Sequence, residues 1–121
     1  MPKPNGLRRE ERLRSRTSVN LLFGGGSYNI TAFPLRAVFR ENEEQINRIL
    51  VSVPKRHLHH AVDRNHIKRQ IREAYRLNKN LLTKGSHYDV AFLWLTGNMI
   101  PSVEVVKRVT TLLQKINERN Q

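Results

Sequence analysis

The side chains with the clearest chemical potential in this sequence are cations that recur along residues 61–76. On an α-helix, which turns by about 100° per residue, they fall within an arc of roughly 140°. The members of this basic arc are Arg64, Asn65, Lys68, Arg69, Arg72 and Arg76. A solvated helix surface is the ordinary alternative, but such surfaces mix charges at spacings of three and four residues, and here only Glu73 interrupts the cations. Like charges held this close favour a polyanionic partner.

The adjoining face of the same predicted helix is apolar. Ile67, Ile71 and Ala74 share it, and Tyr75 lies at the seam between the two faces. The helix should therefore bury one side against a sheet and present its cations beside that side. His66 falls beyond the basic arc, on the back of the helix.

The composition agrees with a nucleic-acid partner. The chain has 121 residues, 22 of them Lys or Arg against 10 Asp or Glu, which gives a net charge of +12. This length predicts one domain with a modest core, residues 1–121, in which residues 1–6 form a loose tail. There is no cysteine, so disulfides and thiolate metal sites are excluded. No signal peptide or membrane-spanning run is recognisable, and we expect a cytoplasmic protein with no membrane partner.

No catalytic or metal site emerges from the remaining reactive side chains. The acidic residues form no pair at a catalytic spacing. A protein nuclease could use His59 or His60 as a base and Lys55 to stabilise charge, but no known motif surrounds them. His57 and His60 have a spacing that suits zinc, but Asp63 is the only acid nearby and no ligand set is complete. We therefore predict no catalytic residue and no metal ligand in this chain.

Three strand-like segments accompany the basic helix. Residues 27–40 alternate apolar and polar side chains from Phe33 onward, which predicts a strand with Phe33 and every second residue after it in the core. Residues 46–53 predict a second strand, and the acidic run at 41–45 suits a hairpin between the two. Residues 88–96 are almost continuously apolar, which is typical of a strand buried on both faces at the centre of a sheet.

Helices complete the pattern at both ends of the chain. Residues 7–23 predict one or two helical turns followed by a helix, and a final helix begins near residue 102. Because Pro34 suggests a break near the start of the first segment, the order is a helix, a short strand and a hairpin, a helix, a strand and a helix. The predicted fold is thus α+β, a single domain in the order α-β-β-β-α-β-α with one small sheet packed by helices.

The basic helix and its surroundings resemble the protein subunit of bacterial ribonuclease P. Residues 64–76 resemble that family's Arg-Asn-Arg motif, and residues 52–56 (Ser-Val-Pro-Lys-Arg) resemble its Ser-Val-Ser-Lys-Lys strand end. Residues 11–15 and 88–90 also fit, so the resemblance covers nearly the whole chain. One position departs: His66 stands where the family usually has Arg, and a neutral imidazole lacks the bidentate fork of a guanidinium.

The resemblance implies a fold and a division of labour. Crossovers between parallel strands are right-handed by default, but this family has an unusual left-handed one, in the fold of the second domain of a small-subunit ribosomal protein. The protein docks on a catalytic RNA subunit, which performs the hydrolysis with Mg²⁺, so the chain itself binds no cofactor. It assists removal of the 5′ leader of precursor tRNA as a monomer, one per RNA.

The resemblance also assigns residues. The surface that docks on the RNA subunit comprises Arg64, Asn65, His66, Lys68, Arg69, Arg72 and Arg76. A separate cleft beside the first helix holds the leader and comprises Phe23, Arg36, Lys55 and Arg56. Apart from the resemblance, the basic charge of residues 7–23 suggests further RNA contacts through Arg12, Arg14 and Arg16, and a solvated tail is the alternative. Phe23 could instead be an ordinary helix-core residue, and Val19 stands where the family has a second cleft aromatic.

Two other functions remain open from the sequence. A small basic ribosomal or RNA-chaperone protein would show the same charge without an enzyme partner. A stand-alone nuclease would cleave RNA without any RNA cofactor.

Overall fold

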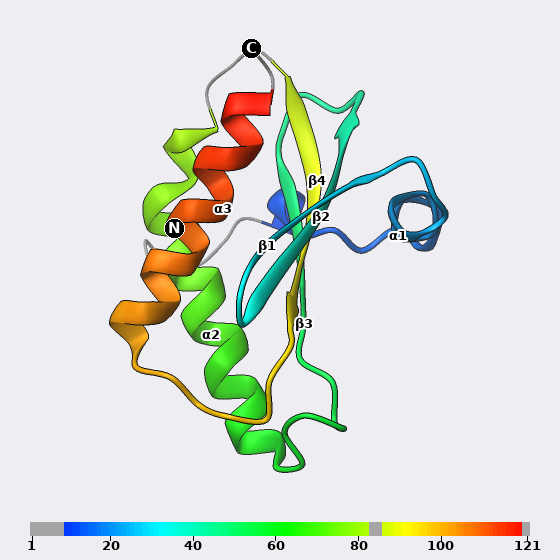
Figure 1. The fold of residues 1–121 in the computed structure, drawn as a ribbon. Helices are drawn as coiled ribbons and strands as arrows, with labels where there is room; N and C mark the ends of the chain where they lie inside the picture. Colours follow the sequence, from blue (N-terminus) through cyan, green and yellow to red (C-terminus); the bar gives the residue numbers. More distant parts are fainter. Residues whose placement is uncertain (1–8, 83–85, 120–121) are drawn as a thin grey trace.

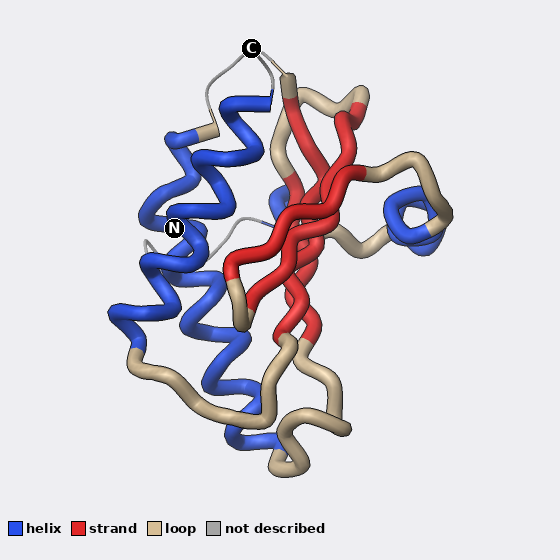
Figure 2. The backbone as a smooth tube through the Cα atoms, in the orientation of Figure 1, coloured by secondary structure: helices blue, strands red, loops and turns tan. Residues whose placement is uncertain are grey.

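The computed structural model describes residues 9–82 and 86–119, and within them a four-stranded sheet with helices on both faces (Figures 1 and 2). The predicted tail at residues 1–6 lies outside the described residues. Two short 3-10 turns, η1 (Arg9–Glu11) and η2 (Lys79–Leu81), accompany the main elements. The main elements are α1 (Arg16–Phe23), β1 (Tyr28–Ala32), β2 (Leu35–Asn42), β3 (Arg48–Ser52), α2 (Ala61–Asn78), β4 (His87–Trp94) and α3 (Ser102–Arg119). The α+β class and the predicted order of elements are confirmed.

The sheet has the strand order β1-β2-β4-β3. β4 runs parallel to β3 and antiparallel to β2, and β1 pairs antiparallel with β2 at the edge. β4 is therefore central, as its continuous apolar run predicts, because a strand between two neighbours with helices on both faces has no side chain in open solvent. α2 provides the crossover between the parallel strands β3 and β4.

One face of the sheet is covered by α2 and α3 (Figure 1). Trp94, Phe92 and Phe39 point into this layer and are fully buried, and Ile67 and Ile71 of α2 meet them there. Burial of about ten large side chains in one layer supplies most of the driving force for folding, since each contributes about 1.5–3 kcal/mol.

Of the helices in the described part of the chain, only α1 lies on the opposite face. Leu13, Leu22, Val38 and Ala91 form a second, smaller buried cluster there. In Figure 1, α1 is seen nearly along its axis while the strands run up the picture, so this helix crosses the strands.

Two expectations about the first strands are wrong. Phe33 is 63% exposed, because the chain turns at the cis Phe33–Pro34 peptide and the alternation toward the core begins only at Leu35. The acidic run at 41–45 does not close a hairpin, because β4 lies between β2 and β3. Local alternation and turn chemistry cannot reveal a strand that is inserted from a distant part of the chain.

Candidate nucleic-acid interface

The apolar stripe of α2 fixes which side of the helix faces outward. Ile67, Ile71, Ala74 and Tyr75 are at most 1% exposed, so the helix lies against the sheet along the whole predicted stripe. Burial raises the pKa of Tyr75, and the nearby Glu11 adds to the rise. The basic arc is thereby held on the outer side of α2, next to the edge strand β3.

The residues predicted to bind the RNA subunit differ in their solvent exposure. Asn65, His66, Arg69 and Arg72 are exposed on α2, and Lys68 is partly exposed.

Two arginines of the arc are engaged within the protein. Arg64 donates from Nη1 to the carbonyl oxygens of Leu58 and His59, at 2.9 and 2.7 Å, and so shapes the loop that leads into α2. Arg76 forms an ion pair with Glu73 at 2.5 Å, which lowers the pKa of Glu73. Arg64 and Arg76 can still bind phosphate, but a phosphate bound there would also lie close to the loop before α2 or to Glu73, respectively.

The N-terminal arginines come together with the basic helix, a relation that sequence spacing does not reveal. The backbone N–H of Leu13 donates to the carbonyl oxygen of Ile49 at 2.8 Å, which places the segment before α1 beside β3. Arg12, Arg14 and Arg72 then line one hollow of about 200 Å³. Although much of the Arg72 side chain is exposed, its partial desolvation beside the hollow lowers its pKa, and the charge of Arg12 lowers it further.

The acid of this segment faces away from the hollow. Glu11 is 6% exposed and accepts an ion pair from Nζ of Lys79 at 2.6 Å. One oxygen of Glu11 is therefore paired at η2, and Glu11 does not line the hollow that Arg12, Arg14 and Arg72 share. Crowded, partly desolvated cations of this kind favour a phosphate between them. Arg16, the last of the three N-terminal arginines predicted to contact RNA, is the exposed first residue of α1 and does not line the hollow.

The sheet face that carries α1 is ordered by the strand register into rows of side chains. The open row is Thr31, Arg36, Leu93 and Ser52; the middle row is Asn29, Val38, Ala91 and Leu50; the polar row is Arg40, Asp89 and Arg48. α1 covers the middle row, because Leu22 is buried with Val38 and Ala91. The open row keeps Arg36 and Thr31 exposed, and Lys55 and Arg56 are exposed just beyond the end of β3.

Phe23 lies on the side of α1 that faces the open row. It is 48% exposed and belongs to neither buried cluster, so an ordinary core role is not what the structure gives it. Relative to the buried Leu22, Ser18 is turned by about 40° to one side and Phe23 by about 100° to the other. Ser18 reaches Arg48 of the polar row, and Phe23 is therefore directed toward the opposite, open row. Val19, at the other family aromatic position, packs against the smaller cluster.

The histidines before α2 lie at the surface. Among the residues that the structure describes, no group of three His, Cys, Asp or Glu side chains lies close enough to hold a metal ion. His59 and His60 are exposed, and His57 is partly exposed.

Comparison with known proteins points in one direction. A family model described as Ribonuclease P matches residues 7–117. The chain is 37% identical over 115 residues to the ribonuclease P protein component of Porphyromonas gingivalis, covering 88% of this chain and 82% of the relative. It is 35% identical over 117 residues to the corresponding protein of Chlorobaculum tepidum, covering 84% and 76%.

Solved structures of similar proteins share the fold. The ribonuclease P protein from Thermotoga maritima superposes with a TM-score of 0.74 at 24% identity, covering 87% of this chain and 96% of the other. That of Staphylococcus aureus gives a TM-score of 0.74 at 18% identity, covering 88% and 94%. Across residues 9–82 and 86–119, no helix is both long and apolar enough to cross a membrane.

Proposed function

Because the chain belongs to the ribonuclease P protein family, we propose that it docks on the catalytic RNA subunit through the outer side of α2 and holds the 5′ leader of precursor tRNA against the open row. As the protein component of ribonuclease P, the chain acts in processing of tRNA 5′ leaders. Neither the ribosomal or chaperone alternative nor the stand-alone nuclease is favoured by the comparisons.

The observation that carries the docking proposal is the hollow between Arg12, Arg14 and Arg72. It joins two basic segments that are far apart in the sequence, one of them on the helix that also carries the exposed Arg69 and the partly exposed Lys68. A duplex or folded RNA presents phosphates at regular intervals, and such a surface binds them without reading sequence.

The leader proposal rests on different side chains. A single strand binds where cations follow its backbone and an aromatic ring can stack on a base. Phe23 supplies the ring, and Arg36, Lys55 and Arg56 supply the cations beside the open row. The two sites lie on different elements, so they can be tested separately.

The hydrolysis itself is assigned to Mg²⁺ on the RNA subunit, and the chain's own part is to lower the electrostatic cost of bringing two polyanions together. The two buried acids among the described residues are already paired with cations: Asp89 with Arg48, and Glu11 with Lys79. We further propose one copy of the protein per RNA subunit, in the cytoplasm.

The first test is cleavage of a precursor tRNA by a bacterial ribonuclease P RNA at low Mg²⁺, with and without this protein. We expect strong stimulation by the protein and no cleavage by the protein alone. Salt-sensitive binding to many structured RNAs without stimulation would overturn the proposal in favour of a chaperone role.

Binding of the RNA subunit at several salt concentrations tests the docking surface. If about six phosphates are neutralised, the logarithm of affinity should fall against the logarithm of salt concentration with a slope of roughly −4 to −5. A slope near zero would contradict docking through cations.

A further inference from the structure

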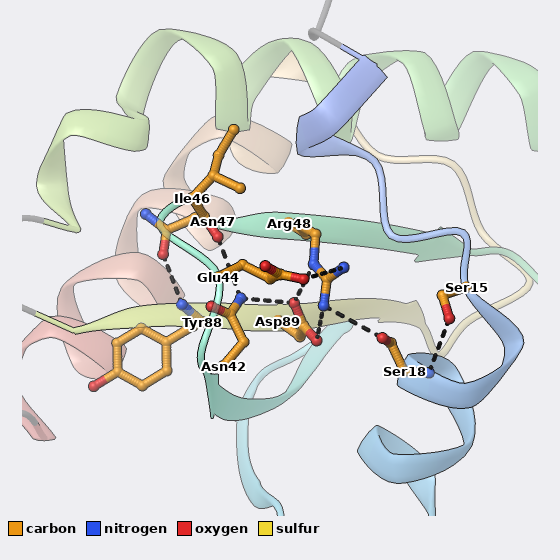
Figure 3. Close-up of polar contacts among 9 residues, drawn as sticks. All are labelled: Ser15, Ser18, Asn42, Glu44, Ile46, Asn47, Arg48, Tyr88 and Asp89. Atoms are coloured by element: carbon orange, nitrogen blue, oxygen red, sulfur yellow. Dashed lines mark hydrogen bonds and ion pairs between the residues drawn. The ribbon is translucent and has the colours of Figure 1, made fainter.

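A buried ion pair lies at the point where three strands and α1 meet (Figure 3). Asp89 of β4 is 3% exposed, in a strand whose other residues are almost all apolar. Its carboxylate accepts from Nε of Arg48 at 2.8 Å and from Nη2 of Arg48 at 2.9 Å. Asn42, at the end of β2, donates from Nδ2 to the same carboxylate at 2.8 Å. A buried acid is costly unless it is paired in this way, so Asp89 holds the Arg48 side chain in one orientation.

Arg48 has a further contact that the ion pair does not need. Its Nη2 atom also donates to Oγ of Ser18 in α1, at 3.4 Å. Figure 3 shows the Arg48 side chain between Asp89 on the sheet and Ser18 on the helix. The guanidinium therefore connects the polar row of the sheet to one side of α1.

The apolar contacts of α1 lie on one side of its axis. Leu22 is its one buried residue, and the partly buried Val19 packs beside it. Because Val19 lies about 60° from Leu22, on the same side as Phe23, these contacts hold the helix against the sheet but do not fix its opposite side. A directional hydrogen bond on one side of that contact limits the rotation.

We infer that Arg48, fixed by Asp89, is a positioning residue that acts through Ser18 to set the rotation of α1 and thereby the placement of Phe23 against the open row. Ser18 and Phe23 lie on opposite sides of Leu22, so a rotation that releases Ser18 moves Phe23 toward or away from the sheet. The inference rests on the proposed leader site. It adds Arg48, Asp89 and Ser18, which would influence leader affinity without contacting the RNA.

The test uses the reconstituted holoenzyme and two precursor tRNAs, one with a long leader and one with a single-nucleotide leader. Replacing Ser18 by Ala removes the link but leaves the buried ion pair intact. Loss of one charge-assisted hydrogen bond should raise KM for the long-leader substrate by about fivefold. We expect kcat and the KM for the short-leader substrate to remain unchanged.

Conservative and control variants separate positioning from general loss of structure. Ser18→Thr keeps the hydroxyl group and should restore KM. Arg48→Lys keeps the charge but cannot contact Asp89 and Ser18 together, so it should match Ser18→Ala. Thr17→Ala removes a neighbouring exposed hydroxyl of α1 and should change nothing.

A double-mutant cycle decides whether Ser18 acts through Phe23. In a Phe23→Ala background, Ser18→Ala should have no further effect on KM. Additive effects, or equal losses on both substrates, would overturn the inference. If Phe23→Ala alone leaves long-leader KM unchanged, the proposed leader site itself is wrong, which is a separate and distinguishable result.

Discussion

The two faces of the sheet are covered to very different degrees, and the difference separates stability from recognition. The face under α2 and α3 is a continuous apolar layer that contains Trp94, Phe92 and Phe39. On the face under α1, the short helix covers only the middle row, which lies between the open row and the polar row. Because the first face carries the folding energy, the second can keep an exposed aromatic ring and unpaired cations available to RNA.

The largest effect should come from the apolar face. Replacing the fully buried Phe92 by Ala should lower the free energy of unfolding by about 3–5 kcal/mol. Urea denaturation measures this loss, and Leu22→Ala on the opposite face is the matched comparison. An equal loss for Leu22→Ala would mean that the two faces contribute alike, which would break the comparison.

Substitution in the polar row should cause the next largest loss of stability. Asp89→Ala leaves the Arg48 guanidinium with the long contact to the exposed Glu44 in place of its buried acid, and removing one partner of a buried pair costs about 3 kcal/mol or more. Replacing both residues by apolar ones of similar size should recover much of this stability. Full recovery of stability together with loss of long-leader affinity would show that this pair serves recognition more than folding.

The docking surface should affect affinity and leave the fold intact. The double variant Arg69→Ala, Arg72→Ala should weaken binding of the RNA subunit about tenfold or more and reduce the steepness of the salt dependence by about 2. Thermal unfolding should be almost unchanged, because both side chains are exposed. Arg64→Ala is an informative contrast, since it also removes two hydrogen bonds to the preceding loop and should lower stability.

Substitution of Phe23 should weaken the binding of one kind of tRNA only. Loss of stacking on one base costs about 1–3 kcal/mol, so Phe23→Ala should weaken binding of precursor tRNA and spare mature tRNA. Equal weakening for both tRNAs would indicate a structural role on the α1 face. Arg36→Ala, on the open row itself, should show the same selectivity through a phosphate contact.

The smallest effect should be the pH dependence of the Glu73–Arg76 pair. The hydrogen bond from Arg76 lowers the pKa of Glu73, so the contribution of the pair is fully present above the ordinary Glu pKa and is lost as pH falls through the lowered value. This pair is solvent-accessible, and Glu73→Gln should therefore change stability only slightly at neutral pH. The free energy of unfolding of the Glu73→Gln variant should also depend less on pH in the acidic range than that of the unsubstituted protein.

How far the sequence predicts this molecule depends on whether a feature is local. The buried side of α2 and the central place of β4 follow from periodicity, and both are confirmed. The exposure of Phe33 was predicted wrongly, because the turn at Pro34 ends an alternation that looks continuous in the sequence.

The proposed RNA-binding sites were likewise predictable only where they depend on local sequence. The residues of the basic arc follow from helix geometry, but the joining of Arg12 with Arg72 depends on the N-terminal segment lying beside β3, which no local pattern specifies. Asp89 gives one signal that could have been used: an acid inside an apolar strand must find a cation. The sequence does not say that the cation is Arg48 or that it also reaches α1.

The insertion of β4 between β2 and β3 also governs how the chain can fold as it is synthesised. Until residues 87–94 have been made, β2 and β3 have no shared neighbour, and the parallel pairing that closes the sheet spans the whole of α2. Such long-range pairing forms late and slowly. A nascent chain that ends before β4 can pair β1 with β2 but cannot join β3 to the sheet, and its cations emerge beside the RNA of the ribosome. Sequence-independent attraction to RNA thus begins before the structure that directs it exists.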